Sequence, residues 1–327
     1  MRILFIYRNT KMGFSIRNVF VPIEREMKKY CDVSSLYLPI PNYSFIGLIR
    51  NINAALKSIR EVKPDVVHIT GTEHYLIPFI KGVKVIVTVH DMESLKINKG
   101  FIRSRFKNLL FVKYLYLADY ITFISEKSEE EGIAALNNKS FRHIVVYDPI
   151  SPQFTYSPKK INMEKPTILH IGTKRNKNLI RVVEALQGMN IHLRIIGVIT
   201  DEQKVALENS KIEYSNAYNL SDSEIVNEYR KCDIVSFPSL YEGFGMPIIE
   251  GQATGRVVVT SDLKPMKTVA GNATVLVNPT SVKSIRDGFE KALEYNSHYI
   301  ELGRRNVERF SLDKIVSQYY NIYKSLL

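Results

Sequence analysis

The stretch IVSFPSLYEGFGMPIIEGQATGRVVVTSD, residues 234–262, decides the fold of this chain. Its apolar runs at 234–237 and 257–260 are typical of buried strands. Pro247 fits the first turn of a helix between them, because its missing N–H is harmless there, and Gly255 can end that helix. The order strand, loop, helix and strand predicts a βαβ unit in a parallel sheet.

Two acids frame the loop and helix of this stretch. Glu242 lies before the glycine loop, and Glu250 lies inside the helix. Gly243 and Gly245 allow the backbone to approach a ligand closely, and the helix N-terminus that follows favours a phosphate. The layout suits a sugar and a ribose on either side of a diphosphate. The alternative is a pair of surface carboxylates on an ordinary α/β unit.

The stretch resembles the C-terminal signature of the retaining glycosyltransferases of family 4. The resemblance implies the GT-B fold, in which two Rossmann-like domains with parallel sheets face a central cleft. It implies that Glu242 contacts the donor sugar and that Glu250 holds the ribose hydroxyls of the nucleotide. It also implies that Phe244, Gly245 and Met246 line the sugar side of the donor site.

The composition indicates a globular protein of two domains. The chain has 327 residues, of which 45% are hydrophobic and 24% charged, which is long for one domain and enough for sizeable cores. The opening MRILFIYRNT has too short an apolar run for a signal peptide or a membrane span and predicts a first strand. Cys31 and Cys232 have no metal-ligand spacing, so reduced core thiols and a cytoplasmic location are expected.

Alternating strand-like and helix-like patterns predict two Rossmann-like domains of the α/β class. A stretch with four prolines, DPISPQFTYSPKKINMEKP, separates them. We therefore expect an acceptor-side domain over 1–155 and a nucleotide-sugar-binding domain over 156–327, and the resemblance suggests that a last helix at about 312–326 packs back on the first domain. The strand-like runs are Ile3–Tyr7, Val33–Leu38, Val66–Thr70, Val85–Val89, Ile121–Ile124, Ile144–Tyr147, Ile168–Ile171, Leu193–Ile196, Ile234–Phe237, Val257–Thr260 and Thr274–Val277.

The chain is basic, with a net charge of +12, and the excess lies mainly in the first half. Residues 1–150 hold 22 basic and 14 acidic side chains. Between Lys96 and Lys113 there are six basic residues and no acids, interleaved with Phe and Leu. This basic amphipathic stretch predicts peripheral contact with an anionic membrane, and an ordinary helix with a solvated basic face is the alternative. No nucleic-acid motif accompanies it, so a nucleic-acid partner is not expected.

A basic turn opens the second domain, in the segment ILHIGTKRNKNLIRVVEAL. A predicted strand ends at Gly172, and Lys174, Arg175 and Lys177 then precede a helix that we expect from about Asn178. Cations at a helix start oppose its dipole unless an anion is present, and a nucleotide diphosphate would resolve that conflict. A solvated basic loop is the alternative.

This turn also resembles the second family signature. By that resemblance Lys177 and Arg175 contact the diphosphate, and Gly172 and Thr173 belong to the donor site. Many family members have an arginine directly after the glycine, where this chain has Thr173.

Further candidates lie where other predicted strands end. His90 directly follows the strand KVIVTV, and the resemblance implies that it touches the donor sugar near the reacting carbon. Gly13 lies in the loop after the first strand, which in family members reaches the diphosphate or the acceptor. Glu73 and His74 follow the third strand and are candidates for the acceptor side, with helix capping or simple solvation as alternatives.

A last candidate segment lies in IEYSNAYNLSDSEIV, where a strand is followed by a turn and a helix. Ser221 and Glu224 have the spacing of a capping box. The resemblance places Tyr218, Asn219 and Leu220 near the nucleobase.

Together these motifs predict a retaining glycosyltransferase. It would move a hexose-type sugar from a UDP- or GDP-sugar to a hydroxyl of a glycan or lipid-linked acceptor, and the family suggests surface glycan or polysaccharide biosynthesis. No DxD motif is present, so we expect no metal and no cofactor besides the nucleotide-sugar co-substrate, with Lys177 and Arg175 neutralising the phosphates. The alternatives are a non-catalytic nucleotide-sugar-binding subunit, a GT-B epimerase and a phosphorylase.

Overall fold

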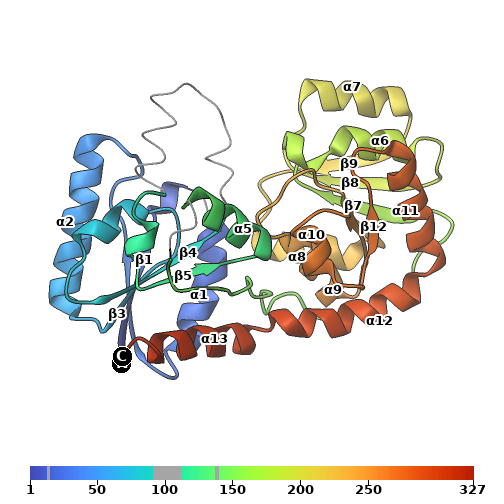
Figure 1. Cartoon of the computed structure of the whole chain (residues 1–327). Coiled ribbons are helices and arrows are strands. Elements are labelled where there is room, and N and C mark those ends of the chain that lie inside the picture. Colours follow the sequence, from blue (N-terminus) through green and yellow to red (C-terminus); the bar gives the residue numbers. More distant parts are fainter. Residues whose placement is uncertain (13–14, 91–111, 137–139) are drawn as a thin grey trace. The chain divides into compact units, whose positions relative to one another are not determined.

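The computed structural model of the protein describes residues 1–12, 15–90, 112–136 and 140–327. The chain forms two units, one made of Met1–Pro149 together with Leu312–Leu327 and the other of Ile150–Ser311 (Figure 1). Each unit contains one parallel six-stranded sheet with helices packed on it. The predicted α/β class with parallel sheets is therefore confirmed.

The first unit is built on a sheet with the strand order β2-β1-β3-β4-β5-β6. Its strands are β1 (Arg2–Tyr7), β2 (Asp32–Tyr37), β3 (Val66–Ile69), β4 (Lys84–Val89), β5 (Tyr120–Phe123) and β6 (His143–Val145). Its α-helices in the described residues are α1 (Ser15–Met27), α2 (Phe45–Val62), α5 (Glu126–Ala135) and α13 (Leu312–Lys324). The 3-10 helices are η1 (Thr10–Met12), η2 (His74–Phe79) and η3 (Leu115–Leu117).

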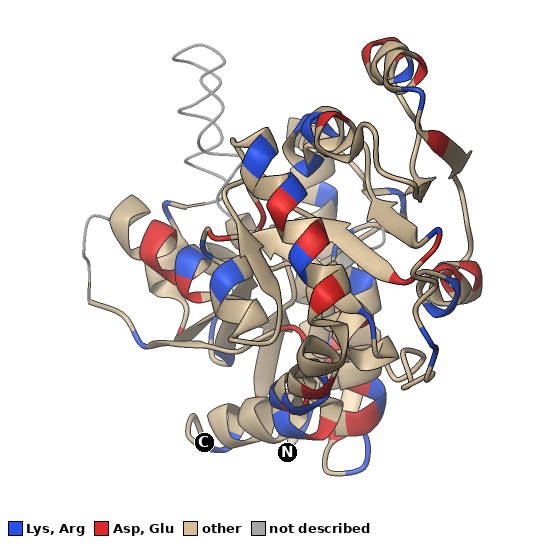
Figure 2. Ribbon diagram, turned by 90° about the vertical axis from the view of Figure 1, so that its right-hand side faces the viewer, with Lys and Arg blue, Asp and Glu red and all other residues tan. Residues whose placement is uncertain are grey.

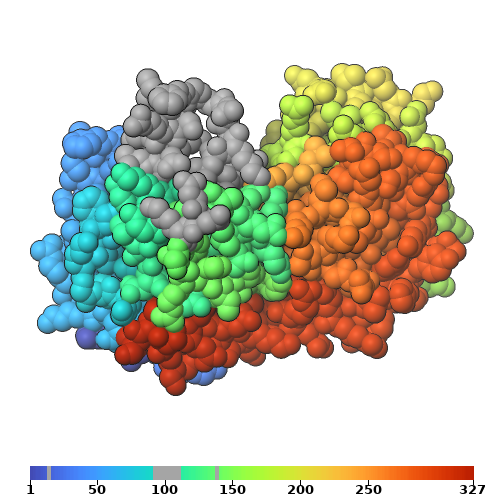
Figure 3. Space-filling view, in the orientation of Figure 1, coloured from blue at the N-terminus to red at the C-terminus, as the bar shows by residue number. Residues whose placement is uncertain are grey.

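The side chains of β1 show how this unit forms its core. Leu4 and Ile6 point to the face that α2 covers, and Ile3 and Phe5 point to the face covered by α1 and α13. This alternation follows from the period of two in a strand, and both faces are buried because helices cover both. The helix α13 comes from the end of the chain and packs beside α1, and in Figure 3 its dark red residues lie against the first unit.

The second unit is built on a sheet with the order β12-β11-β10-β7-β8-β9. Its strands are β7 (Thr167–Ile171), β8 (His192–Ile196), β9 (Glu213–Ala217), β10 (Ile234–Phe237), β11 (Val257–Ser261) and β12 (Val275–Val277). Its α-helices are α6 (Leu179–Leu186), α7 (Asp201–Ser210), α8 (Asp222–Lys231), α9 (Met246–Thr254), α10 (Met266–Ala270), α11 (Val282–Glu294) and α12 (Asn296–Val307). The 3-10 helices are η4 (Arg175–Lys177) and η5 (Glu308–Phe310).

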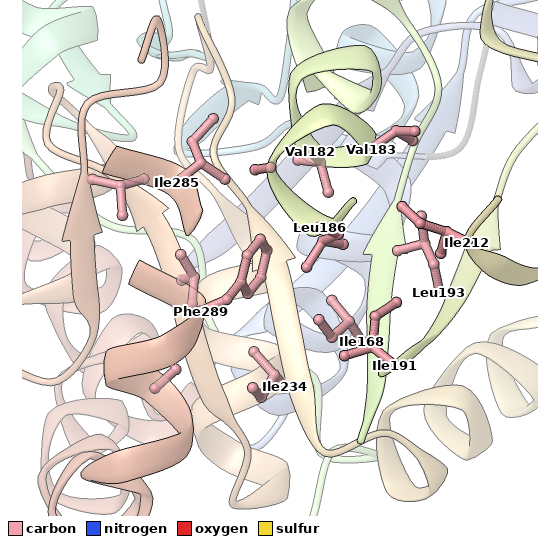
Figure 4. Close-up of a cluster of buried hydrophobic side chains, with 14 of the residues drawn as sticks. Ile168, Val182, Val183, Leu186, Ile191, Leu193, Ile212, Ile234, Ile285 and Phe289 are labelled. Carbon is pink, nitrogen blue, oxygen red and sulfur yellow. The ribbon is translucent and has the colours of Figure 1, made fainter. Parts of the chain in front are cut away.

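Helices cover both faces of the second sheet. On one face α6 and α11 pack over the strands, and Figure 4 shows Val182, Leu186 and Phe289 meeting side chains of the sheet there. On the other face lies α9, where a Cβ added to Gly251 would stand 2.8 Å from a methyl group of Val258. Because α9 packs this closely on the strands, its N-terminus and the loop before it have a fixed position at the carboxyl ends of the strands.

In each sheet the strand order reverses at one place. In the second sheet β7 lies beside β10, and in the first sheet β1 lies beside β3. Loops leave such neighbouring strands in opposite directions, and ligands of open α/β sheets bind at the carboxyl ends of the strands at this point. The loops concerned are 172–178 and 238–245 in the second unit, and 8–12 and 70–74 among the described residues of the first.

The two cysteines have different surroundings in the structure. Both are free thiols, as expected; Cys232 is buried, and Cys31, which follows the end of α1, is partly buried and packs against the core of the first unit. Along the helices facing the viewer in Figure 2, acidic and basic residues alternate, as in the pairs Lys283–Asp287 and Arg286–Glu290. Of the helices in the described parts of the chain, none has both the length and the apolar character to cross a bilayer.

Candidate active site

The loop from β10 into α9 has the local structure that its residues predict. Gly245 precedes α9 with a φ of 121°, a backbone conformation that side chains disfavour. Pro247 lies in the first turn of the helix, and Gly255 ends it in the left-handed conformation. The helix therefore begins directly after the acidic and glycine-rich segment, and its first amides lie at the switch point of the sheet.

Lys177 and Glu242 meet at this switch point. Lys177 ends the short helix η4 after β7, and its Nζ lies 2.6 Å from Oε1 of Glu242, in the loop after β10. The ammonium group also lies 4.7 Å from the ring centroid of Phe237. Asn176 donates a hydrogen bond to the same carboxylate oxygen at 3.3 Å. Two predicted site residues that are far apart in sequence are thus in direct contact.

Asn178 holds these two loops together and was not predicted as part of the site. It adopts a left-handed conformation, and α6 begins at Leu179, so the helix starts one residue later than we expected. Its side-chain amide donates to the carbonyl oxygens of Pro238, at 3.0 Å, and Pro279, at 2.7 Å. Asparagine tolerates this backbone conformation better than most residues, which is the signal that could have identified it.

The remaining residues of the basic turn have different environments. Gly172 has a φ of 90°, and a Cβ there would lie 2.9 Å from Cγ of Lys177, so the glycine makes room for the lysine stem. The hydroxyl of Thr173 donates to the carbonyl oxygen of Val198, which is a structural use of that side chain. Arg175 is exposed. Of the predicted site residues in this turn, Lys177 is therefore the one that contacts Glu242.

Glu250 lies on α9, and the charge of Lys177 acts on its carboxylate. Its carboxylate is partly exposed, and the hydroxyl of Tyr229 donates a hydrogen bond to Oε2. Burial raises the pKa of Glu250 to about 7, against the opposing effects of the Tyr229 bond and the charge of Lys177. Glu250 can therefore change its charge near neutral pH.

Phe244 and Met246 flank Gly245 in different environments. The ring of Phe244 is 4% exposed and packs edge-on against Phe310, with the ring centroids 5.7 Å apart. With its ring buried in this way, Phe244 can contact a ligand only through its main chain. Met246 is the first residue of α9 and is partly exposed.

The predicted base-side residues lie at the edge of the sheet. Tyr218, Asn219 and Leu220 follow β9, the edge strand, and the Tyr218 side chain is 58% exposed. The predicted capping box is confirmed, since the Ser221 hydroxyl accepts from the Glu224 N–H and the Glu224 carboxylate accepts from the Ser221 N–H at 2.7 Å.

His90 belongs to the first unit and follows β4. Its Nε2 donates to the carbonyl oxygen of Thr70 at 2.9 Å, since a carbonyl oxygen can only accept. Burial lowers the pKa of His90 to about 4, so the ring is neutral at pH 7 and its Nδ1 carries no proton. Gly13 and nearly all of the basic stretch 96–113 lie outside the described residues.

Glu73 and His74 are buried, and their role on the acceptor side stays a prediction. Glu73 is 1% exposed, and it precedes η2 without making a side-chain cap. Its Oε1 accepts from the Thr72 hydroxyl at 3.2 Å, and among the described residues its Oε2 has no hydrogen-bond partner. Burial raises the pKa of Glu73 to about 7, and the charge of Arg8 opposes the rise. Neither capping nor solvation describes this carboxyl group.

Arg256 is a second residue that sequence reasoning missed. It is buried at the start of β11, and its guanidinium donates to the carbonyl oxygens of Tyr229, at 2.9 Å, and Arg230, at 2.7 Å. It also donates to Thr254 at 3.2 Å, at the end of α9. The cation thus interacts with the negative ends of α8 and α9 and holds them together.

Among the described residues, no three His, Cys, Asp or Glu side chains meet in a way that could hold a metal ion.

With this geometry in view, the chain can be compared with known proteins. Residues 153–309 match the family model of the glycosyl transferases group 1. Over these residues, which are just under half of the chain, the protein is a glycosyl transferases group 1 domain. The matched residues are almost the whole second unit and include Lys177, Glu242 and Glu250.

Curated relatives match parts of the chain. The serotype-specific mannosyltransferase WbdA of Escherichia coli is 36% identical over 83 residues, which are 25% of this chain and 10% of that protein. The O-antigen chain mannosyltransferase RfbU of Salmonella typhimurium is 25% identical over 264 residues, which are 75% of this chain and 70% of that one. The match to WbdA thus spans only about a tenth of that longer protein.

Solved structures resemble the chain over its full length. Sucrose-phosphate synthase of Thermosynechococcus elongatus has a TM-score of 0.81 at 15% identity, with 100% of this chain and 99% of that chain covered. WaaG, a glycosyltransferase involved in lipopolysaccharide biosynthesis, has a TM-score of 0.73 at 15% identity, with 99% of each chain covered. This likeness confirms the predicted GT-B fold.

Proposed function

We propose that this protein moves a hexose from a UDP- or GDP-sugar to an acceptor hydroxyl, with retention of the anomeric configuration. The observation that supports this most strongly is the contact between Lys177 and Glu242 at the switch point of the second sheet, 2.6 Å between Nζ and Oε1. A cation and an acceptor of hydroxyl hydrogen bonds are thereby held where a parallel sheet binds its ligand. Glu250 lies on the helix that begins at the same loop.

The charges of this site suit the departure of a nucleotide diphosphate. Negative charge grows on the diphosphate as the bond to the sugar breaks, so cations and amides beside it act more strongly in the transition state than in the ground state. Lys177 supplies one such charge, and the exposed Arg175 and the N-terminus of α9 are placed in the same loops. These groups are proposed to replace a metal ion in neutralising the diphosphate.

Glu242 and His90 are proposed to act on the sugar. Glu242 accepts hydrogen bonds and orients the sugar ring without attacking it. His90 is neutral and has an acceptor at Nδ1, so it suits contact with a sugar hydroxyl near the reacting carbon. In the front-face mechanism that we favour, the acceptor hydroxyl attacks the anomeric carbon, the bond to the diphosphate breaks, and the leaving phosphate takes the acceptor proton.

The relatives support a hexose donor and a role in surface glycans. RfbU and WbdA are named as mannosyltransferases, and RfbU as one that acts on O-antigen chains. The structure of HepE from Anabaena was determined with UDP and glucose. We propose a glycan or lipid-linked acceptor, a cytoplasmic location and peripheral contact with an anionic membrane through residues 96–113.

Binding of a nucleotide diphosphate is the first test. In a thermal-shift panel of UDP, GDP, ADP and CMP, stabilisation by one diphosphate would support the donor site and name its base. Transfer from the matching sugar nucleotides to methyl mannoside and to water would then be measured. No stabilisation by any nucleotide would contradict the proposal. Stabilisation without turnover would favour the non-catalytic subunit, and interconversion of the donor sugars would favour an epimerase.

A further inference from the structure

We propose that Tyr229 is a positioning residue that aims the Glu250 carboxylate at the pentose of the donor and makes the chain select ribonucleotide over 2′-deoxyribonucleotide donors. This inference rests on the proposed function. It adds a residue that no family signature in the sequence marked, and it names the class of donor that the site admits.

The hydrogen bond between the two side chains fixes the carboxylate on one side. Tyr229 lies on α8 and is fully buried, whereas Glu250 lies on α9 and is partly exposed. The Tyr229 hydroxyl donates to Oε2 of Glu250. A carboxylate offers about four acceptor positions, so the bond with Tyr229 leaves room for two hydroxyl donors. The vicinal 2′ and 3′ hydroxyls of a ribose are such a pair.

Two contacts hold Tyr229 in place, one to its backbone carbonyl oxygen and one to its ring. Its carbonyl oxygen accepts from Nε of the buried Arg256 at 2.9 Å, and Arg256 also bonds Thr254 at the end of α9. The Tyr229 ring packs edge-on against Phe154, with the centroids 5.2 Å apart. Because Arg256 joins the two helices, the distance between the Tyr229 hydroxyl and Glu250 is set by the frame of the unit. The carboxylate therefore meets a ligand in a preset orientation.

The same bond favours the charged form of Glu250. Burial raises the pKa of this group to about 7, and the groups that act on it are Tyr229 and Asp222 of α8 and Lys177 of the loop after β7. The Tyr229 bond and Lys177 favour the carboxylate, and Asp222 opposes it. A protonated carboxyl group has fewer acceptor positions for the two hydroxyls. Removal of the Tyr229 hydroxyl would thus raise the pKa of Glu250 and weaken ribose binding most at low pH.

Selectivity for ribose follows from this arrangement. A site built to hydrogen-bond a hydroxyl binds the analogue that lacks it poorly, because its own polar groups are then left unpaired. For a bond to a charged group we expect UDP or GDP to bind about 10- to 100-fold more tightly than the 2′-deoxy analogue. The ratio of the two dissociation constants therefore measures how well Glu250 is aimed.

The test compares Tyr229→Phe with the wild-type full chain by isothermal titration with UDP, GDP and their 2′-deoxy analogues. The variant keeps the ring and loses the hydroxyl. We expect it to bind the ribonucleotide about tenfold more weakly and the deoxyribonucleotide almost unchanged, so that the ratio falls. The KM for the donor should rise while kcat stays within about twofold, and the loss should be larger at pH 6.5 than at pH 8.5.

Two further variants complete the design. Tyr299→Phe changes another tyrosine of the same unit, on α12, and should leave the ratio unchanged. In Glu250→Gln the ratio should already be low, and adding Tyr229→Phe should lower it no further, since both act through one carboxylate. The inference is overturned if the wild type binds UDP or GDP without preferring ribose, or if Tyr229→Phe weakens both nucleotides equally. If the wild type binds neither diphosphate, the proposed donor site fails first.

Discussion

The switch points of the two sheets carry similar residues in different surroundings. In the second sheet Lys177 follows β7 and Glu242 follows β10, and the two side chains are in direct contact. In the first sheet Arg8 follows β1 and Glu73 follows β3, and the arginine charge acts on the carboxyl group. The side chain of Glu242 is 14% exposed, whereas Glu73 is 1% exposed.

This difference teaches that topology places the residues and burial sets their chemistry. Neighbouring parallel strands bring the residues after them to one edge in both sheets. Desolvation then penalises the charged form of Glu73 and raises its pKa to about 7, so that it can donate or accept a proton near neutral pH. The carboxylate at the second switch point has a cation as its direct partner, whereas the carboxyl group at the first lies in a buried site.

The largest expected effect concerns Glu242. Glu242→Ala should reduce the rate of sugar transfer about 10³-fold while the affinity for UDP or GDP survives, because the carboxylate is proposed to contact the sugar and not the nucleotide. Turnover is measured at saturating donor, and affinity by calorimetry. Glu73→Gln serves as the matched change in the first unit and should keep donor affinity. Loss of nucleotide affinity in Glu242→Ala, without loss of turnover at saturation, would contradict the assigned role.

The buried carboxyl group of Glu73 should make stability depend on pH. Its pKa is about 7 in the folded protein, above its ordinary value, so between about pH 4.5 and 7 the folded state keeps a proton that the unfolded state loses, and stability falls as pH rises. Glu73→Gln should remove this cost and stabilise the first unit by about 3 kcal/mol at pH 8 and by little at pH 4.

Urea unfolding at both pH values measures this difference. Glu242→Gln is the control in the second unit, and it should gain no stability at pH 8, because Glu242 has Lys177 as its partner. An equal gain in the two variants would break the comparison between the switch points.

Lys177→Ala should separate diphosphate from nucleoside binding. Loss of a charge-assisted contact is expected to weaken UDP or GDP about 30-fold, and to leave uridine or guanosine nearly unchanged, since only the phosphates meet the ammonium group. Competition binding with all four ligands measures the effect. If the nucleosides weaken as much as the diphosphates, Lys177 does not contact phosphate in the complex.

The smallest expected effect concerns His90. His90→Asn should lower kcat about tenfold through loss of one hydrogen bond to the sugar. Since the pKa of His90 is about 4, the ring stays neutral, and the ratio of wild-type to variant rates should be constant from pH 6 to pH 8. A ratio that changes tenfold across this range would show that a charged imidazole takes part. The profile of kcat against pH for both proteins decides this.

Local features of the fold could be predicted from the sequence because each depends on a short stretch. The strand at 234–237, the helix start at Pro247 and its end at Gly255 follow from apolar pattern and turn chemistry within one segment. The capping box of Ser221 and Glu224 follows from a spacing of three residues. The family signature in the same region also identified the donor-site candidates, whose roles stay predictions.

Features that join distant segments could not be predicted in this way. The hydrogen bonds of Asn178 to Pro238 and Pro279, and those of Arg256 to the ends of two helices, depend on which strands become neighbours. A buried arginine that donates to several backbone carbonyl oxygens also contradicts the usual exposure of arginine. Nothing in the local sequence marks such a residue.

The sequence by itself determined the α/β class, the order of the elements and the motif that carries Glu242 and Glu250, because periodicity and turn chemistry act over a few residues. The contact of Lys177 with Glu242 and the hydrogen bond of Tyr229 to Glu250 became visible only in the folded chain. The physical reason is that strand order and burial are properties of the whole fold. Strand order determines which charged side chains come into contact, and burial determines which of them are desolvated. Both therefore determine the chemistry of residues that the sequence had already shown.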